Sequence, residues 1–148
     1  MPDVAGEGAP RSKFHERPLV IGRPVWEAMI RHCRDQLPNE ACGLLSGRGG
    51  RASSIWPMKN TAASPFSFRM DDQQVKRVFE HIHTLGEQLA GIYHSHPTAP
   101  AVPSPLDILL APYEDIPYIV VSLAGPAPEV GCYRINDKRA TPWPVIID

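Results

Sequence analysis

The chain has 148 residues, and its 15 lysine and arginine residues against 16 aspartate and glutamate residues give a formal net charge of −1. This balance provides no electrostatic reason to expect binding to nucleic acid or to an anionic membrane. The longest apolar runs, such as residues 118–123, are also far too short to cross a bilayer. We therefore expect neither a nucleic-acid partner nor a membrane partner.

Three widely spaced cysteines, at positions 33, 42 and 132, form no Cys-x-x-Cys pair. This pattern disfavours thiolate zinc ribbons and thioredoxin-like redox chemistry, and it is typical of free thiols in a reducing cytosol. Residues 1–17 are rich in glycine, proline and charged residues and lack the apolar core of a signal peptide. We expect a flexible leader over residues 1–17, a single domain over residues 18–148 and a cytoplasmic location.

The first part of this domain predicts one helix and a hairpin. Pro24 suits the first turn of a helix, and apolar residues recur at helical spacing up to about Gln36, before Pro38 ends the helix. Residues 40–47 have the composition of a short apolar strand that ends at a glycine-rich turn. Residues 52–58 would return as its hairpin partner.

The remainder alternates between helix and strand. Residues 60–71 are predicted to form a loop, and Asp71 or Asp72 then caps a helix that extends to about Leu89. The later elements are a buried strand over 90–94, a proline-rich loop over 97–103, a short helix from Ser104, and strands over 117–123, 131–135 and 143–147. This mixed order indicates the α/β class, with a mixed central sheet flanked by helices rather than a simple parallel pattern.

The segment from His94 to Asp107 carries the main chemical signal. Residues two apart in an extended backbone point to the same side, so His94 and His96 can present two imidazoles to one point at the end of a strand. Asp107 is the nearest downstream carboxylate and lies on the first turn of the next helix. Two histidines, one aspartate and one water would make an open tetrahedral site of the kind expected of a catalytic zinc, so we expect one Zn²⁺ per chain.

A second His-x-His pair, His81 and His83, lies within the helix predicted from Asp71 or Asp72. At 3.6 residues per turn, two positions correspond to a rotation of about 200°, so these two side chains diverge. An intact helix therefore prevents them from binding one metal ion together.

The segment Ser104-Pro-Leu-Asp107 also has the sequence of a helix start. Ser104 would be the N-cap, Pro105 the first helical residue, and Asp107 a carboxylate near the positive end of the helix. We expect this capping role to compete with metal binding for the Asp107 carboxylate. The spacing of these residues leaves both roles open.

The whole pattern resembles the JAMM (MPN-plus) family of metallo-isopeptidases. In the family motif, an upstream Glu precedes His-Ser/Thr-His-Pro, seven residues separate the second His from a Ser, and an Asp lies three positions after that Ser. His94, His96, Ser104 and Asp107 fill the downstream positions, and Glu40 lies in a segment that looks like the family's Glu-x-Cys-Gly-Leu strand. The resemblance spans roughly residues 18–136 and is closest to small, stand-alone prokaryotic members.

The resemblance implies a zinc metallopeptidase with an MPN/JAMM-like, cytidine-deaminase-like architecture. It implies that Glu40, which is not a ligand, accepts a proton from the zinc-bound water and passes it to the leaving amine, and that Ser104 donates a hydrogen bond to the oxyanion. It further implies that the enzyme hydrolyses an amide or isopeptide bond after the C-terminal glycine of a ubiquitin-like or sulfur-carrier protein with a Gly-Gly terminus. The long insertions with which eukaryotic members grip polyubiquitin are absent or reduced, and a monomer and a homodimer both stay open.

Two other functions need weighing. MPN domains that have lost their ligands act as non-catalytic scaffolds, but this chain keeps all five motif residues. A zinc deaminase would need His-x-Glu and Pro-Cys-x-x-Cys segments, which the sequence lacks. Cys42, on the same strand face as Glu40, is interpreted as a small buried apolar residue rather than a nucleophile.

Overall fold

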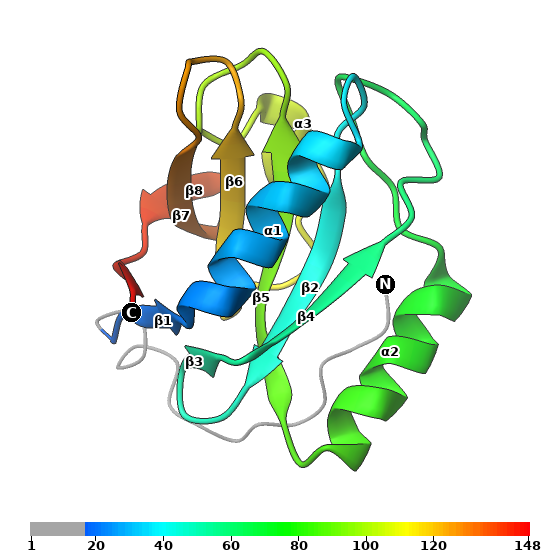
Figure 1. Cartoon of the computed structure of the whole chain (residues 1–148), viewed down its shortest axis with the longest axis vertical. Coiled ribbons are helices and arrows are strands. Elements are labelled where there is room, and N and C mark those ends of the chain that lie inside the picture. Colours follow the sequence, from blue (N-terminus) through cyan, green and yellow to red (C-terminus); the bar gives the residue numbers. More distant parts are fainter. Residues whose placement is uncertain (1–16) are drawn as a thin grey trace.

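A computed structural model describes residues 17–148, so all of the predicted leader except Arg17 lies outside the described residues. Within this part of the chain, six strands form one mixed sheet and three short strands form another (Figure 1). The six-stranded sheet contains, in spatial order, β4 (Ser54–Met58), β2 (Cys42–Gly47), β5 (Gln88–His96), β6 (Tyr118–Ser122), β7 (Glu129–Asn136) and β8 (Arg139–Pro142). Adjacent strands in this sheet run antiparallel, except β5 and β6, which run parallel to each other. The mixed central sheet that the sequence predicted is confirmed.

The three-stranded sheet joins the two ends of the described chain. Its strands, in spatial order, are β3 (Arg51–Ala52), β1 (Leu19–Ile21) and β9 (Val145–Ile147). Both pairings are parallel. The return strand predicted over 52–58 is thus divided into β3 and β4, and the strand predicted over 143–147 is confined to β9.

The first predicted helix is confirmed as α1 (Arg23–Asp35). Pro24 occupies its first turn, where the missing N–H would have no intrahelical partner in any case. Its buried side is formed by Val25, Met29, Ile30 and Cys33, which recur at helical spacing. This side packs against one face of the central sheet.

The second helix, α2 (Asp72–Thr84), is shorter than predicted. Asp71 caps it by accepting a hydrogen bond from the Gln74 N–H at 3.0 Å. At its other end Gly86 has a φ of +70°, a left-handed conformation that commonly ends helices. The N–H groups of Gly86 and Glu87 then donate to the carbonyls of His83 and Ile82. The predicted extension to Leu89 was wrong, because residues 88 and 89 belong to β5.

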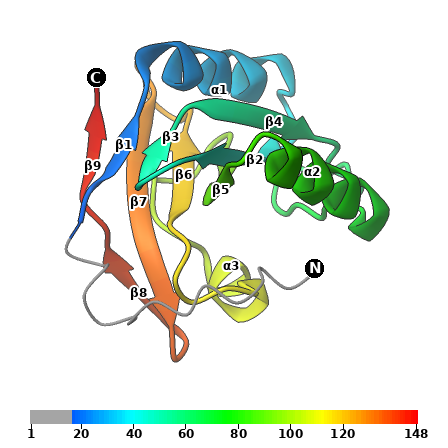
Figure 2. The same ribbon diagram turned by 90° about the horizontal axis from the view of Figure 1, so that it is seen from below.

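Side chains of the central sheet alternate between two faces. Leu45, Tyr93 and Ile119 face α1, whereas Leu44 and Ile92 pack with residues of α2. Figure 2 shows α1 on one side of the sheet and α3 (Pro105–Leu110) on the other. His94 and His96 lie two and four positions after Ile92 on the same strand. Their side chains therefore point to the same face as Ile92, the face covered by α2 and α3. None of the helices in the described part of the chain has both the length and the apolar character of a membrane-spanning segment.

Candidate metal centre

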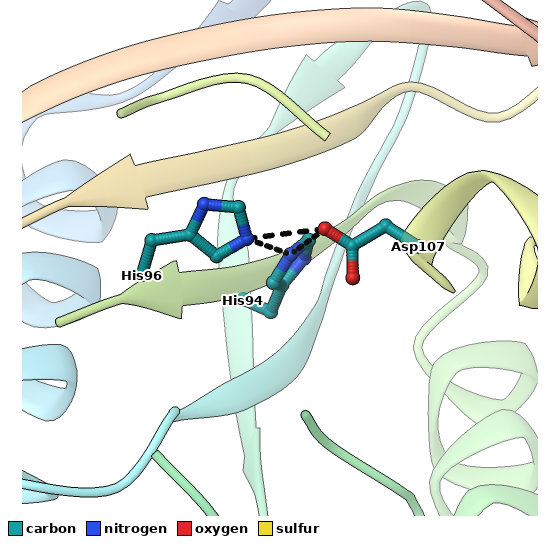
Figure 3. A group of neighbouring side chains, drawn as sticks. All are labelled: His94, His96 and Asp107. Carbon is teal, nitrogen blue, oxygen red and sulfur yellow. Dashed lines mark hydrogen bonds and ion pairs between the residues drawn. The ribbon is translucent and has the colours of Figure 1, made fainter. Parts of the chain in front are cut away.

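His94 and His96 lie at the carboxyl end of β5, and both are buried. Their side chains point to one place, where Asp107 of α3 meets them (Figure 3). The Asp107 Oδ2 atom lies 2.9 Å from Nε2 of His94 and 3.1 Å from Nε2 of His96, and the two Nε2 atoms are 3.2 Å apart. Among the described residues, these three make the only group of at least three His, Cys, Asp or Glu side chains placed to hold a metal ion.

Asp107 serves as a helix cap and faces the imidazoles at the same time. Its Oδ2 atom accepts the Ser104 N–H at 2.9 Å, and Ser104 Oγ accepts the Asp107 N–H at 3.0 Å, which completes a capping box. The same Oδ2 atom makes both imidazole contacts. Without a metal ion, one oxygen atom of Asp107 thus closes the capping box and faces both imidazoles, and the expected competition between capping and metal binding stays a prediction.

Hydrogen bonds to three successive backbone carbonyl groups fix the loop between β5 and α3. Ser122 Oγ donates to Ala99 O at 2.7 Å, and Tyr133 Oη donates to Ala101 O at 2.7 Å. Between them, Nδ1 of His96 lies 2.9 Å from Pro100 O. A carbonyl can only accept, so Nδ1 carries the hydrogen of this bond. Nε2 then has no hydrogen in the neutral ring, and it donates to Asp107 only when the ring is protonated.

The His94 ring is held differently. It stacks on Phe68 from the 60–71 loop, with ring centroids 4.6 Å apart and an interplanar angle of 26°. Its Nδ1 atom is buried and has no hydrogen-bond partner among the described residues. The contact with Phe68 brings a third segment of the chain to the site. The sequence did not indicate that the Pro100 carbonyl accepts a hydrogen bond from His96, because any residue type provides a backbone carbonyl.

At His94 and Asp107 the electrostatics favour the protonation states that a metal needs, whereas at His96 they favour the protonated ring. Burial lowers the pKa of His94 and favours its neutral form. Burial also acts to lower the pKa of His96, but hydrogen bonds to Asp107 and Pro100 outweigh it and raise that pKa. For Asp107, the hydrogen bonds from both imidazoles outweigh burial and hold the pKa well below its usual range. Asp107 is therefore ionised, as a metal ligand must be.

Glu40 lies beside this group without belonging to it. The register of β2 on β5 pairs Cys42 with His94, so Glu40, two residues before Cys42, is brought to the end of β5. Burial raises the pKa of Glu40 to about 7, with His96 opposing the rise and Asp107 adding to it. The Oε1 atom is buried and has no hydrogen-bond partner among the described residues.

Other residues singled out in the sequence fall into place around the site. Cys42 is fully buried, and burial followed by the nearby Glu40 raises its pKa to about 12, which agrees with an apolar role. His81 and His83 are both exposed on α2, and neither joins the ligand group. A hollow of about 460 Å³ between β4 and α2 contains none of the three candidate ligands.

Two imidazoles and a carboxylate at a strand end, with a buried glutamate beside them, define the class: a candidate metallohydrolase centre on an α/β fold. The chain belongs to the family described as prokaryotic homologs of the JAB domain, which matches residues 22–136. This confirms the predicted JAMM/MPN family and, with it, a peptidase of the JAMM type.

Individual relatives agree with this assignment. The chain is 38% identical to the CysO-cysteine peptidase of Mycobacterium tuberculosis over 130 residues. This aligned region covers 86% of this chain and 89% of that protein. It is 31% identical over 123 residues to a probable TtuB-protein conjugate cleaving protease of Thermus thermophilus, covering 82% of each. The solution structure of protein DSY2949 from Desulfitobacterium hafniense has a TM-score of 0.80 at 33% identity, covering 87% of this chain and 92% of that one.

Proposed function

We propose that this protein is a zinc-dependent hydrolase that cleaves the amide or isopeptide bond after the C-terminal glycine of a ubiquitin-like or sulfur-carrier protein. The observation that carries the proposal is the convergence of two imidazole nitrogens and one carboxylate oxygen within 3.2 Å of one another beside a buried carboxylate. Three such acceptor atoms repel each other unless a proton or a cation lies between them.

His94, His96 and Asp107 would hold one Zn²⁺ per chain. Two nitrogens and one oxygen are a usual donor set for catalytic zinc, which keeps its fourth position open. When bound, zinc supplies a water whose pKa falls to about 7 and polarises the scissile carbonyl. The Pro100 carbonyl would fix the ring orientation of His96, and the Ser104 N–H would fix the carboxylate of Asp107.

Glu40 would act as the general base and then as the general acid. Its raised pKa, about 7, lies near the operating pH, where a carboxyl both accepts and releases a proton readily. The partnerless Oε1 atom supports this role, since no donor of the protein competes with the attacking water for this oxygen.

Ser104 would donate to the oxyanion that develops on the scissile carbonyl. Its Oγ atom accepts the Asp107 N–H, and this leaves the hydroxyl hydrogen available to the substrate. Ser104 is the N-cap of α3 and lies three residues before Asp107. The position of its hydroxyl is therefore coupled to that of the candidate ligand.

The relatives and the family motif support the proposed substrate class. One relative is named for cleaving CysO-cysteine and another for cleaving conjugates of TtuB with protein. We propose a carrier with a Gly-Gly terminus as the partner of this chain. The three buried, unpaired cysteines are compatible with the reducing cytoplasm as the place of the reaction.

The test is a panel of Gly-Gly-tailed carrier proteins joined to a lysine side chain, a cysteine or a peptide. Each conjugate is incubated with the protein, with and without chelator, and the products are read by intact mass. Cleavage after the terminal glycine that chelator removes and added zinc restores is the expected result. Glu40→Gln is the matched variant and should bind one zinc per chain without turnover. Native protein that contains no metal and cleaves no conjugate would instead favour a scaffold.

A further inference from the structure

Asn60 is a buried polar residue at the start of the 60–71 loop, and it is 7% exposed. Its Nδ2 atom donates to Glu40 O at 2.9 Å and to Ser67 O at 3.0 Å. Its Oδ1 atom accepts the N–H groups of Ala62 at 3.0 Å and Arg69 at 3.1 Å. All donors and acceptors of the amide group are thus used, and the arrangement of two carbonyls on one side and two N–H groups on the other fixes its orientation.

One of these bonds reaches the main chain of the candidate base. The Glu40 carbonyl accepts from Asn60, and the Glu40 N–H donates to Ser64 O at 2.9 Å in the same loop. The next residue, Ala41, is held from the other side, because its N–H donates to Ser95 Oγ at 2.8 Å and its carbonyl accepts the Ser95 N–H at 3.0 Å. The loop and β5 therefore hold the Glu40 segment between them.

The same amide group also fixes the part of the loop that touches a candidate ligand. Its bonds to Ser67 O and to the Arg69 N–H enclose Phe68 on both sides. Phe68 is the residue whose ring stacks on His94. Both sides of the candidate centre, the base and one imidazole, are thus tied to a single side chain whose own hydrogen bonds go to neither the base carboxylate nor the imidazole.

We propose that Asn60 is a positioning residue that sets the place of Glu40, and through Phe68 the ring of His94, for the hydrolysis proposed above. The inference rests on that proposed function for its catalytic part. The positioning itself concerns only contacts within this chain. Groups that orient the residues around a metal centre typically contribute 10–100-fold to activity.

The test uses two variants of Asn60 and a control from the same loop. Asn60→Asp keeps the acceptor for Ala62 and Arg69 but loses both donors, whereas Asn60→Ala loses all four bonds. Thr61→Val is the control, because Thr61 Oγ1 donates to Arg69 O at 3.0 Å and the bond has no connection to Glu40. The first measurement is amide hydrogen exchange in the metal-free protein. The Glu40 amide should exchange at least tenfold faster in both Asn60 variants, while amides of the central strand β6 and of the control keep their wild-type rates.

The second measurement is steady-state cleavage of the best conjugate by the zinc-loaded proteins. Both Asn60 variants should lose 10–100-fold in kcat with KM within twofold of wild type, because the substrate contacts are intact. Thr61→Val should keep kcat within twofold.

The outcomes separate the two proposals. Unchanged Glu40 exchange, equal acceleration of the β6 amides, or a kcat within twofold of wild type would overturn the positioning role. Failure of both Asn60 variants to fold would also overturn it, by making Asn60 a residue of general stability. If wild-type protein cleaves no conjugate but the Glu40 amide responds as expected, the proposed function fails and the positioning of Glu40 stands.

Discussion

Replacing Glu40 with glutamine should stabilise the metal-free protein at alkaline pH and have much less effect in acid. Burial raises the pKa of Glu40 from 4.5 to about 7 in the folded chain, His96 opposing and Asp107 adding to the rise. The folded state therefore binds this proton more tightly than the unfolded state does. The stability that this provides is complete below pH 4.5 and is lost as the pH rises to about 7.

The size of the effect follows from the shift. Each pKa unit corresponds to about 1.4 kcal/mol, and Glu40 is only 3% exposed, so solvent screens the carboxylate little. Integrated from pH 5 to pH 8, the wild-type chain should lose about 2.5 kcal/mol through this group. Glutamine does not ionise in this range, so the Glu40→Gln protein does not lose this part of its free energy of unfolding. The difference in unfolding free energy between Glu40→Gln and wild type should therefore grow by about 2.5 kcal/mol over this range.

Urea unfolding at pH 5, 6, 7 and 8 in the presence of chelator measures this difference, and the effects of titrating groups remote from Glu40 cancel between the two proteins. Glu27→Gln, on the exposed side of α1, is the control and should differ from wild type by less than about 0.5 kcal/mol at every pH. A Glu40→Gln difference that stays constant within about 0.5 kcal/mol from pH 5 to pH 8 would refute the reasoning.

Further variants examine the ligands, the cap and the packing. Asp107→Asn should leave the chain folded but abolish stoichiometric zinc binding in equilibrium dialysis, because the charge that faces both imidazoles is lost; one retained zinc per chain would contradict the ligand assignment. Ser104→Ala should lower kcat by about a hundredfold and the free energy of unfolding by about 1 kcal/mol, and unchanged kcat would exclude the oxyanion role. Gly43→Ala should destabilise the fold by about 1–3 kcal/mol in urea unfolding, since the added Cβ would lie 2.4 Å from the Tyr93 ring. His83→Ala should keep zinc content and turnover within twofold of wild type, and a loss of zinc would show that His83 takes part in metal binding.

The geometry of the candidate centre could be predicted where it depends on backbone period. A separation of two residues brings His94 and His96 together because β5 is extended, and the same separation keeps His81 and His83 from forming a site on α2. The sequence could not show that one oxygen atom of Asp107 serves both the helix start and the imidazoles. That outcome depends on tertiary geometry, which places α3 against the end of β5.

The misjudged boundaries have local physical causes. Apolar residues continue at helical spacing beyond Thr84, and only the left-handed conformation of Gly86 ends α2 and frees residues 88 and 89 for β5. Strand β8 was missed because its turn is unusual. Asp137 and Lys138 both have positive φ, 52° and 58°, in a two-residue connection between β7 and β8 that is commonly marked by glycine.

The capping box of α3 has a consequence for how the metal would load. A helix of six residues is too short to be stable by itself, so its first turn depends on Ser104 and Asp107. Because the Asp107 oxygen that closes this turn also faces both imidazoles, ordering of the helix and capture of an ion by this group would be thermodynamically linked. A substitution that unwinds α3 should then weaken affinity for the ion without altering a candidate ligand, and the ion should in return make the helix harder to unwind.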